Sequence, residues 1–206
     1  MKILPVYYFP PVAWFAAAAQ EQHVVLEQWI HYRKQNFYNR TCVKTPDKTL
    51  NLTIPIQKAA DNTPLHQREI SYDWHWQHDH WKSLESAYRR SPYFEYYENE
   101  IQSFFTIKES KLLDFNLKAL QSICRILGME LEWKLSDAYE ASAHYSQDLR
   151  HAFPTKTEEL PQQFIPQPYL QVFGSTFTPN LSILDLLFNK GPESLGLLKA
   201  SWVDHR

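Results

Sequence analysis

The sequence predicts one α/β domain, with a mixed sheet that starts from a βαβ unit and carries a β-hairpin and a three-helix segment. Its 206 residues suit a single domain over 1–206, since domains usually span roughly 100–200 residues. Apolar runs on both sides of an alanine-rich segment indicate the βαβ unit. Amphipathic periodicity in the middle of the chain indicates the helices that pack on the sheet.

The βαβ unit is predicted from the first residues. Residues 3–7 and Val24-Val25-Leu26 are apolar runs of strand length, and residues 12–20 between them are rich in alanine. Two buried strands joined by a helix pair in parallel, and ligands gather beyond the carboxyl ends of such strands. We therefore expect the loop at residues 8–11 to lie beside the segment that begins at Glu27.

A β-hairpin is predicted next. The turn sequence at residues 45–48 separates a short strand at 42–44 from residues 50–56, where apolar and polar side chains alternate. Pro55 cannot donate a hydrogen bond and marks the end of that strand or an edge of the sheet. Residues 68–72 are predicted to form another short strand.

The next segment predicts three helices with clear boundaries. They span residue 74 to about 90, 94–105 and 106–127. Asp73 is the expected N-cap of the first, a capping box is expected to begin the third, and Gly128 is expected to end it.

The last third of the chain is less regular. Residues 131–135 alternate as in a strand, whereas 136–168 are polar and rich in proline, which indicates a surface excursion or a lid. Residues 169–173 are expected to form a final strand. A helix capped by Ser182, together with an acid three residues later, is then expected to stop at Gly191.

The composition excludes several classes of function. A net charge of −2 gives no basic field for nucleic acid, and no run approaches the ~18 apolar residues of a membrane span. Four glycines form no phosphate loop, and two isolated cysteines suit a reducing, cytoplasmic setting. The apolar N-terminus imitates a signal peptide, but Pro5, Pro10 and Pro11 interrupt it, which favours mature protein.

The segment Tyr32–Arg40 is the strongest candidate for function. It mixes cations, amides and aromatics without a strand or helix periodicity, and polar loops at strand ends are often functional. Lys34 and Arg40 suit a clamp for phosphate or carboxylate, and Glu27 suits an orienting group or a base. The competing interpretation is a solvated approach to the hairpin, with cations paired to nearby acids.

Other reactive side chains have simpler explanations. His75 and His78 share a helix face, but no closed set of ligands accompanies them, so no metal site is predicted. His80 suits either a functional or a structural buried imidazole. Cys42 is expected to be a small buried residue rather than a nucleophile. The aromatics from residue 7 to residue 14, Tyr8 among them, suit either stacking on a ligand or the core.

The chain resembles the WbqC-like family of bacterial proteins, from its first residues to about Ser194. The opening from Pro5 to Pro11 matches. So do Glu27, Tyr32, Lys34, Gln35, Asn39 and Arg40, Leu52-Thr53-x-Pro55, His80-Trp81, Ala87-Tyr88, Ser91 to Phe94, Tyr169-x-Gln171, and Phe177 to Asn189. Many members carry Leu-Ser-Gly where this chain has Leu135-Ser136-Asp137.

The resemblance implies a role in cell-surface polysaccharide (lipopolysaccharide) biosynthesis, among enzymes that modify sugars or transfer aminoacyl groups. The first hypothesis is a cytoplasmic transferase acting on a small molecule, a nucleotide-activated or lipid-linked sugar or an acyl donor. The alternative is a non-catalytic binding or assembly protein. The sequence names no cofactor and no oligomeric state. For the transferase, the candidate catalytic residues are Glu27, Lys34 and His80, and the candidate substrate-binding residues are Tyr8, Tyr32, Gln35, Asn39 and Arg40.

Overall fold

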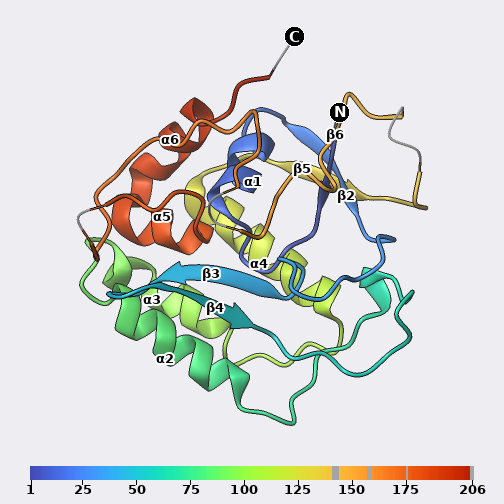
Figure 1. Ribbon diagram of the computed structural model, residues 1–206, viewed down its shortest axis with the longest axis horizontal. Coiled ribbons are helices and arrows are strands. Elements are labelled where there is room, and N and C mark those ends of the chain that lie inside the picture. The colour runs from blue at the N-terminus through green and yellow to red at the C-terminus, as the bar shows by residue number, and fades with distance from the viewer. Residues whose placement is uncertain (141–143, 157–158, 175, 205–206) are drawn as a thin grey trace.

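A computed structural model describes residues 1–140, 144–156, 159–174 and 176–204, and it confirms the α/β class (Figure 1). Its main sheet has four parallel strands in the order β5-β2-β1-β6. These strands are β1 (Lys2–Pro5), β2 (His23–Glu27), β5 (Glu132–Leu135) and β6 (Gln147–Asp148). The expected βαβ unit is confirmed, with α1 (Val12–Ala18) between β1 and β2 and buried along its whole length.

The hairpin forms as expected but lies in a sheet of its own. It consists of β3 (Arg40–Lys44) and β4 (Thr49–Thr53), so the parallel and antiparallel pairings occupy two sheets rather than one mixed sheet. The amide of Ser182 donates to the carbonyl of Cys42 (2.7 Å), so the chain entering α5 covers this edge of β3. A covered edge has no free backbone groups to recruit another strand.

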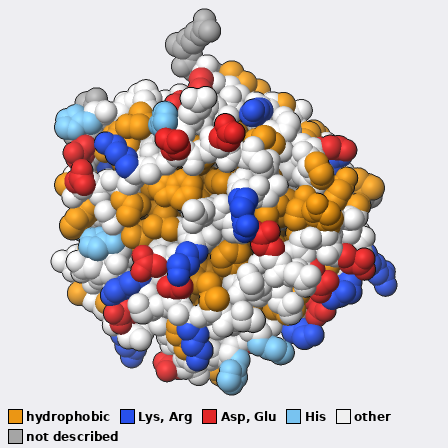
Figure 2. All heavy atoms as spheres, turned by 180° about the vertical axis from the view of Figure 1, so that it is seen from behind, with side chains coloured by type: hydrophobic (Ala, Val, Ile, Leu, Met, Phe, Trp, Pro, Cys, Tyr) orange, Lys and Arg blue, Asp and Glu red, His pale blue; other side chains and the backbone are white. Residues whose placement is uncertain are grey.

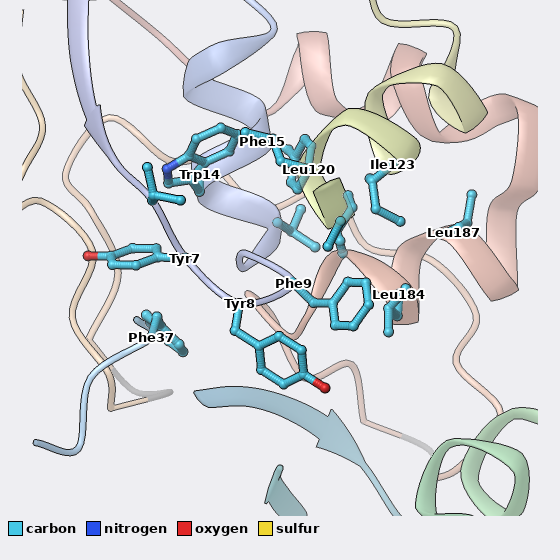
Figure 3. Close-up of a cluster of buried hydrophobic side chains, with 14 of the residues drawn as sticks. Tyr7, Tyr8, Phe9, Trp14, Phe15, Phe37, Leu120, Ile123, Leu184 and Leu187 are labelled. Carbon is cyan, nitrogen blue, oxygen red and sulfur yellow. The ribbon is translucent and has the colours of Figure 1, made fainter. Parts of the chain in front are cut away.

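The helices surround the hairpin and the parallel sheet. In Figure 1 the hairpin lies between α5 on one side and the pair α2 and α3 on the other. Figure 3 shows side chains of α1, α4 and α5 meeting in one core, with Trp14, Leu120 and Leu184 among them. The α-helices are α2 (Trp76–Tyr88), α3 (Phe94–Ser103), α4 (Leu112–Leu127), α5 (Ile183–Lys190) and α6 (Ser194–Ala200), and the short 3-10 helices are η1 (Leu65–Gln67) and η3 (Gly191–Glu193).

The loop after β1 and the segment Tyr32–Arg40 meet as predicted. The amide of Tyr8 donates to the carbonyl of Phe37 (2.9 Å), and the rings of Tyr7 and Phe37 lie 5.6 Å apart. Figure 3 shows Tyr7 and Phe37 facing each other. The loop after β1 therefore packs directly on the segment Tyr32–Arg40.

Two predicted helix starts are wrong because local side-chain bonds compete with capping. The carboxylate of Asp73 accepts a hydrogen bond from Ser71 (2.8 Å), and α2 begins only at Trp76. The hydroxyl of Thr106 donates to the carbonyl of Ser103 (2.8 Å) instead of opening a helix, so α4 begins at Leu112. Gly128 ends α4 in the left-handed conformation, as predicted.

The predicted strands at 68–72 and 169–173 are absent, although both lie in described parts of the chain. Residues 68–72 make only isolated bridges. In the second stretch, Tyr169 and Gln171 turn inward and donate to the carboxylate of Asp185 (2.6 and 2.9 Å). Within the excursion predicted at 136–168, residues 147–148 form β6 and pair with β1, which the sequence did not predict.

The surface carries no concentration of one charge in the view that Figure 2 gives from behind. Acidic and basic side chains lie next to one another there, between hydrophobic patches. Within the described residues, no helix has the length and apolar character needed to cross a bilayer.

The end of α5 tests this description of the fold. Gly191 has φ of 49° and ψ of −121°, and a Cβ there would lie 2.4 Å from the ring of Tyr93. We expect Gly191→Ala to lower the free energy of unfolding by at least about 2 kcal/mol in urea titrations. Gly196 in α6 has open space around its Cα. A Gly196→Ala control that destabilises as strongly would contradict the account.

Candidate functional site

The carboxyl edge of the parallel sheet gathers polar side chains from distant parts of the chain. Glu27 ends β2, Ser136 follows β5, and Arg150 follows β6. The chain leaves β1 toward β2, while β6 lies on the other side of β1, so the direction of winding changes at β1. Ligands of open parallel sheets bind beyond the carboxyl ends of the strands near such a point.

A buried ion pair closes this edge. Nη1 of Arg150 lies 3.1 Å from Oε2 of Glu27, and the two side chains are 2% and 0% exposed. Oε1 of Glu27 accepts from the hydroxyl of Ser136 (2.8 Å) and from the amide of Trp29 (2.7 Å). Both oxygens of the buried carboxylate therefore accept hydrogen bonds within the protein, which suits an orienting role better than that of an accessible base.

Asp148 completes the network on the other side of Arg150. Its two carboxylate oxygens accept from Nε (2.9 Å) and Nη2 (2.6 Å) of Arg150 in the bidentate arrangement. These hydrogen bonds lower the pKa of Asp148 and, as the largest cause, raise the pKa of Arg150. Two carboxylates thus surround one guanidinium.

A hollow of about 310 Å³ opens above this network. The ring of Tyr139 lies 4.3 Å from the guanidinium carbon of Arg150, and the indole of Trp29 donates to the carbonyl of Ser136 (2.9 Å). The buried network therefore fixes two aromatic walls of the hollow. Its lining residues are Trp29, Ile30, His31, Arg33, Tyr139 and His151.

The lining suits a ring-bearing anion. Arg33 and two imidazoles supply hydrogen-bond donors, and the two aromatic side chains supply flat surfaces for stacking. No carboxylate is among the described residues that line the hollow. Small-molecule sites combine apolar walls with a few directional polar groups in this way.

The residues that the sequence singles out fall into separate environments. Lys34 and Gln35 lie exposed in a turn, where Gln35 has a positive φ of 58°. Tyr32 donates to Oδ1 of Asn39 (3.1 Å), and Asn39 is followed by Arg40 at the start of β3. The structure thus brings Tyr32, Asn39 and Arg40 together and leaves Lys34 and Gln35 outside this group.

Tyr8 and His80 form a third environment, inside the core. The hydroxyl of Tyr8 lies 3.0 Å from Nδ1 of His80, and the two residues are 0% and 5% exposed. Burial lowers the pKa of His80 to about 4, so the imidazole is neutral near pH 7. Contact of either ring with a ligand would require the loop after β1 to open. Cys42 is likewise buried, and burial raises the pKa of its thiol.

Sequence reasoning gave no role to several residues of this site. Arg33 lies within the segment Tyr32–Arg40, but the family motif does not include it and no role was predicted for it. Tyr139, Arg150 and His151 lie in a stretch without periodicity. Ser136 carries a usable signal, because it directly follows a predicted strand. The burial of Arg150 has no such signal, since it depends on a carboxylate 123 residues away.

Removal of the buried carboxylate should cost stability. We expect Glu27→Ala to lower the free energy of unfolding by about 3 kcal/mol, because Arg150, Ser136 and Trp29 lose their shared acceptor. Glu159 also lies 3.1 Å from a cation, Lys156, but both are exposed. Urea denaturation should show Glu159→Ala within about 0.5 kcal/mol of wild type. Equal losses for the two variants would refute the role of burial.

The buried imidazole predicts a pH dependence. The pKa of His80 is about 4 in the folded protein and near 6.5 when the chain is unfolded, so the unfolded state binds the extra proton first. The contribution of neutral His80 to the free energy of unfolding is therefore fully present above pH 6.5, and about 3 kcal/mol of it is lost as the pH falls to 4. His80→Gln should remove this component, whereas His78→Gln, at an exposed site of α2, should keep it. Parallel pH profiles for wild type and His80→Gln would count against the assignment.

Comparison with known proteins places this chain in a family. The model of the WbqC-like protein family matches residues 6–158 and 151–196. A Mycobacterium tuberculosis protein described as uncharacterized protein Rv1507c is 24% identical over 221 residues, which cover 93% of this chain and 94% of that protein. No solved structure matches the chain. Because the family match extends over most of the sequence, the chain belongs to the WbqC-like protein family.

Proposed function

We propose that the protein is a transferase that binds a nucleotide-activated or lipid-linked sugar in the hollow at the carboxyl edge of the sheet. The observation that carries the proposal is the combination of two fixed aromatic walls, a basic rim and the absence of a carboxylate among the described lining residues. Diphosphate and sugar are the two parts that this combination suits. A cytoplasmic role in polysaccharide biosynthesis belongs to the same proposal.

In this proposal the lining residues have distinct tasks. Arg33 pairs with the phosphoryl oxygens, and Trp29 and Tyr139 stack on the base or the sugar ring. His31 and His151 are the imidazoles of the rim, and an imidazole exchanges protons readily near neutral pH. Glu27 acts as a positioning residue, since its contacts hold the Trp29 amide and the Arg150 guanidinium beneath the hollow.

Binding of nucleotide sugars tests the proposal. A thermal-shift panel of nucleotide sugars, amino acids and acyl donors identifies the class, and calorimetry then measures affinity. We expect Arg33→Gln to weaken binding of the nucleotide sugar about tenfold or more, because a charge-assisted hydrogen bond contributes about 1.5–3 kcal/mol. Lys48→Gln removes another exposed cation, in the hairpin turn, and should bind as wild type does. Loss of binding in both variants, or in neither, would overturn the assignment.

One observation favours the alternative, a non-catalytic binding or assembly protein of the same pathway. Glu27 and His80, the two groups expected to handle a proton, are sealed in the interior. A flat panel of small molecules, together with recovery of a pathway protein in pull-downs, would support this alternative. Turnover of a nucleotide sugar that stops in Arg33→Gln but continues in Lys48→Gln would exclude it.

A further inference from the structure

We propose a second site, separate from the hollow, in which Arg40 and Arg68 bind a phosphoryl oxyanion beside Tyr32. The two guanidinium groups come from different elements, the start of β3 and the residue after η1. Neither is within 4.0 Å of a carboxylate among the described residues. The site does not depend on the transferase activity.

Arg68 is the unusual member of the pair. Its side chain is buried, with the residue only 4% exposed, yet its acceptors are neutral backbone carbonyls. Nη2 donates to the carbonyl of Ala60 (2.9 Å) and, at 3.4 Å, to that of Asp61. Nε is buried with no acceptor in the described chain. Buried charges are normally paired, so this cation lacks its usual counterion.

Arg40 repeats the pattern at the start of β3. Its side chain is half-buried, and its Nε is buried with no acceptor among the described residues. The backbone of Arg40 is fixed, since it pairs with Thr53 in the hairpin register. A fixed strand position presents the guanidinium without a large loss of backbone freedom on binding.

Tyr32 connects the two cations. The guanidinium carbon of Arg68 lies 4.9 Å from the centre of the Tyr32 ring, and the Tyr32 hydroxyl donates to Asn39, the neighbour of Arg40. Burial raises the pKa of Tyr32, and the charges of Arg68 and Arg40 both oppose that rise. Tyr32 therefore contacts Arg68 through its ring and the residue beside Arg40 through its hydroxyl.

Other arginines show what this pair lacks. Arg89 contacts Glu85 and Glu98, Arg125 contacts Glu100, and Arg150 contacts Glu27 and Asp148. Those cations are already neutralised by the chain. Two unneutralised guanidiniums favour a group that carries two charges and several oxygens, which describes a phosphoryl group better than a single carboxylate.

Calorimetric titration with inorganic pyrophosphate at low ionic strength tests the site. We expect binding by the wild-type protein and a loss of affinity of about tenfold or more in Arg40→Gln and in Arg68→Lys. Lysine keeps the buried positive charge but lacks the planar set of donors. The Arg68→Lys variant is therefore expected to fold and to lose only the hydrogen bonds to the anion. Thermal unfolding of each variant verifies that the fold is retained.

Lys34→Gln is the matched control, since it removes an exposed cation from the same segment without touching Tyr32. Its affinity for pyrophosphate should stay within about twofold of wild type. Absence of pyrophosphate binding by wild type would overturn the proposal, and so would an equal loss in Lys34→Gln. Pyrophosphate bound in the hollow would instead lose affinity in Arg33→Gln and keep it in Arg40→Gln and Arg68→Lys, so failure here is distinct from failure of the proposed function.

Discussion

The buried ion pair between Glu27 and Arg150 is the constraint on which the functional edge of this protein depends. It joins the end of β2 to the residues after β6, across 123 residues of chain. Two charges in the core remain stable only while both are present, because either one alone would be an uncompensated buried charge. The pair therefore holds the segment after β5 against the sheet and keeps Tyr139 over Arg150.

The arrangement also explains why the site is built from strand ends rather than from the polar segment alone. Strand pairing fixes the ends of β2, β5 and β6 at one edge, and each end contributes side chains to the hollow. The side chains of the segment Tyr32–Arg40 then lie in separate places. Arg33 faces the hollow, Tyr32 packs under Arg68, and Lys34 and Gln35 stay in solvent. One stretch of sequence thus contributes side chains both to the hollow and to the contact with Arg68.

Local signals predicted much of the fold. Contiguous apolar runs gave the βαβ unit, and Gly128 and Gly191 ended helices where expected, because each allows a positive φ. Competition between local bonds limited this accuracy, as at Asp73 and Thr106. The strand β6 had no sequence signal, since Gln147 and Asp148 are polar and their pairing with β1 is a long-range event.

The candidate site was less predictable than the fold for the same reason. The expected contact between the loop after β1 and Tyr32–Arg40 follows from parallel topology, and the structure confirms it. The identity of the lining residues depends on which strand ends become neighbours, which only the full strand order decides. The roles of Arg150 and Tyr139 could therefore not be predicted from the composition of their own segments.

The most direct test of a ligand site at the carboxyl edge is the indole N–H spectrum of the protein, recorded by 15N–1H NMR with and without a nucleotide sugar. Among the seven tryptophans, Trp29 lines the hollow, and Trp74, 71% exposed near the start of α2, lies outside the hollow and serves as the reference. A ligand bound in the hollow should produce a saturable shift of the Trp29 signal while the Trp74 signal stays unchanged. A saturable shift elsewhere with Trp29 unmoved would contradict this assignment.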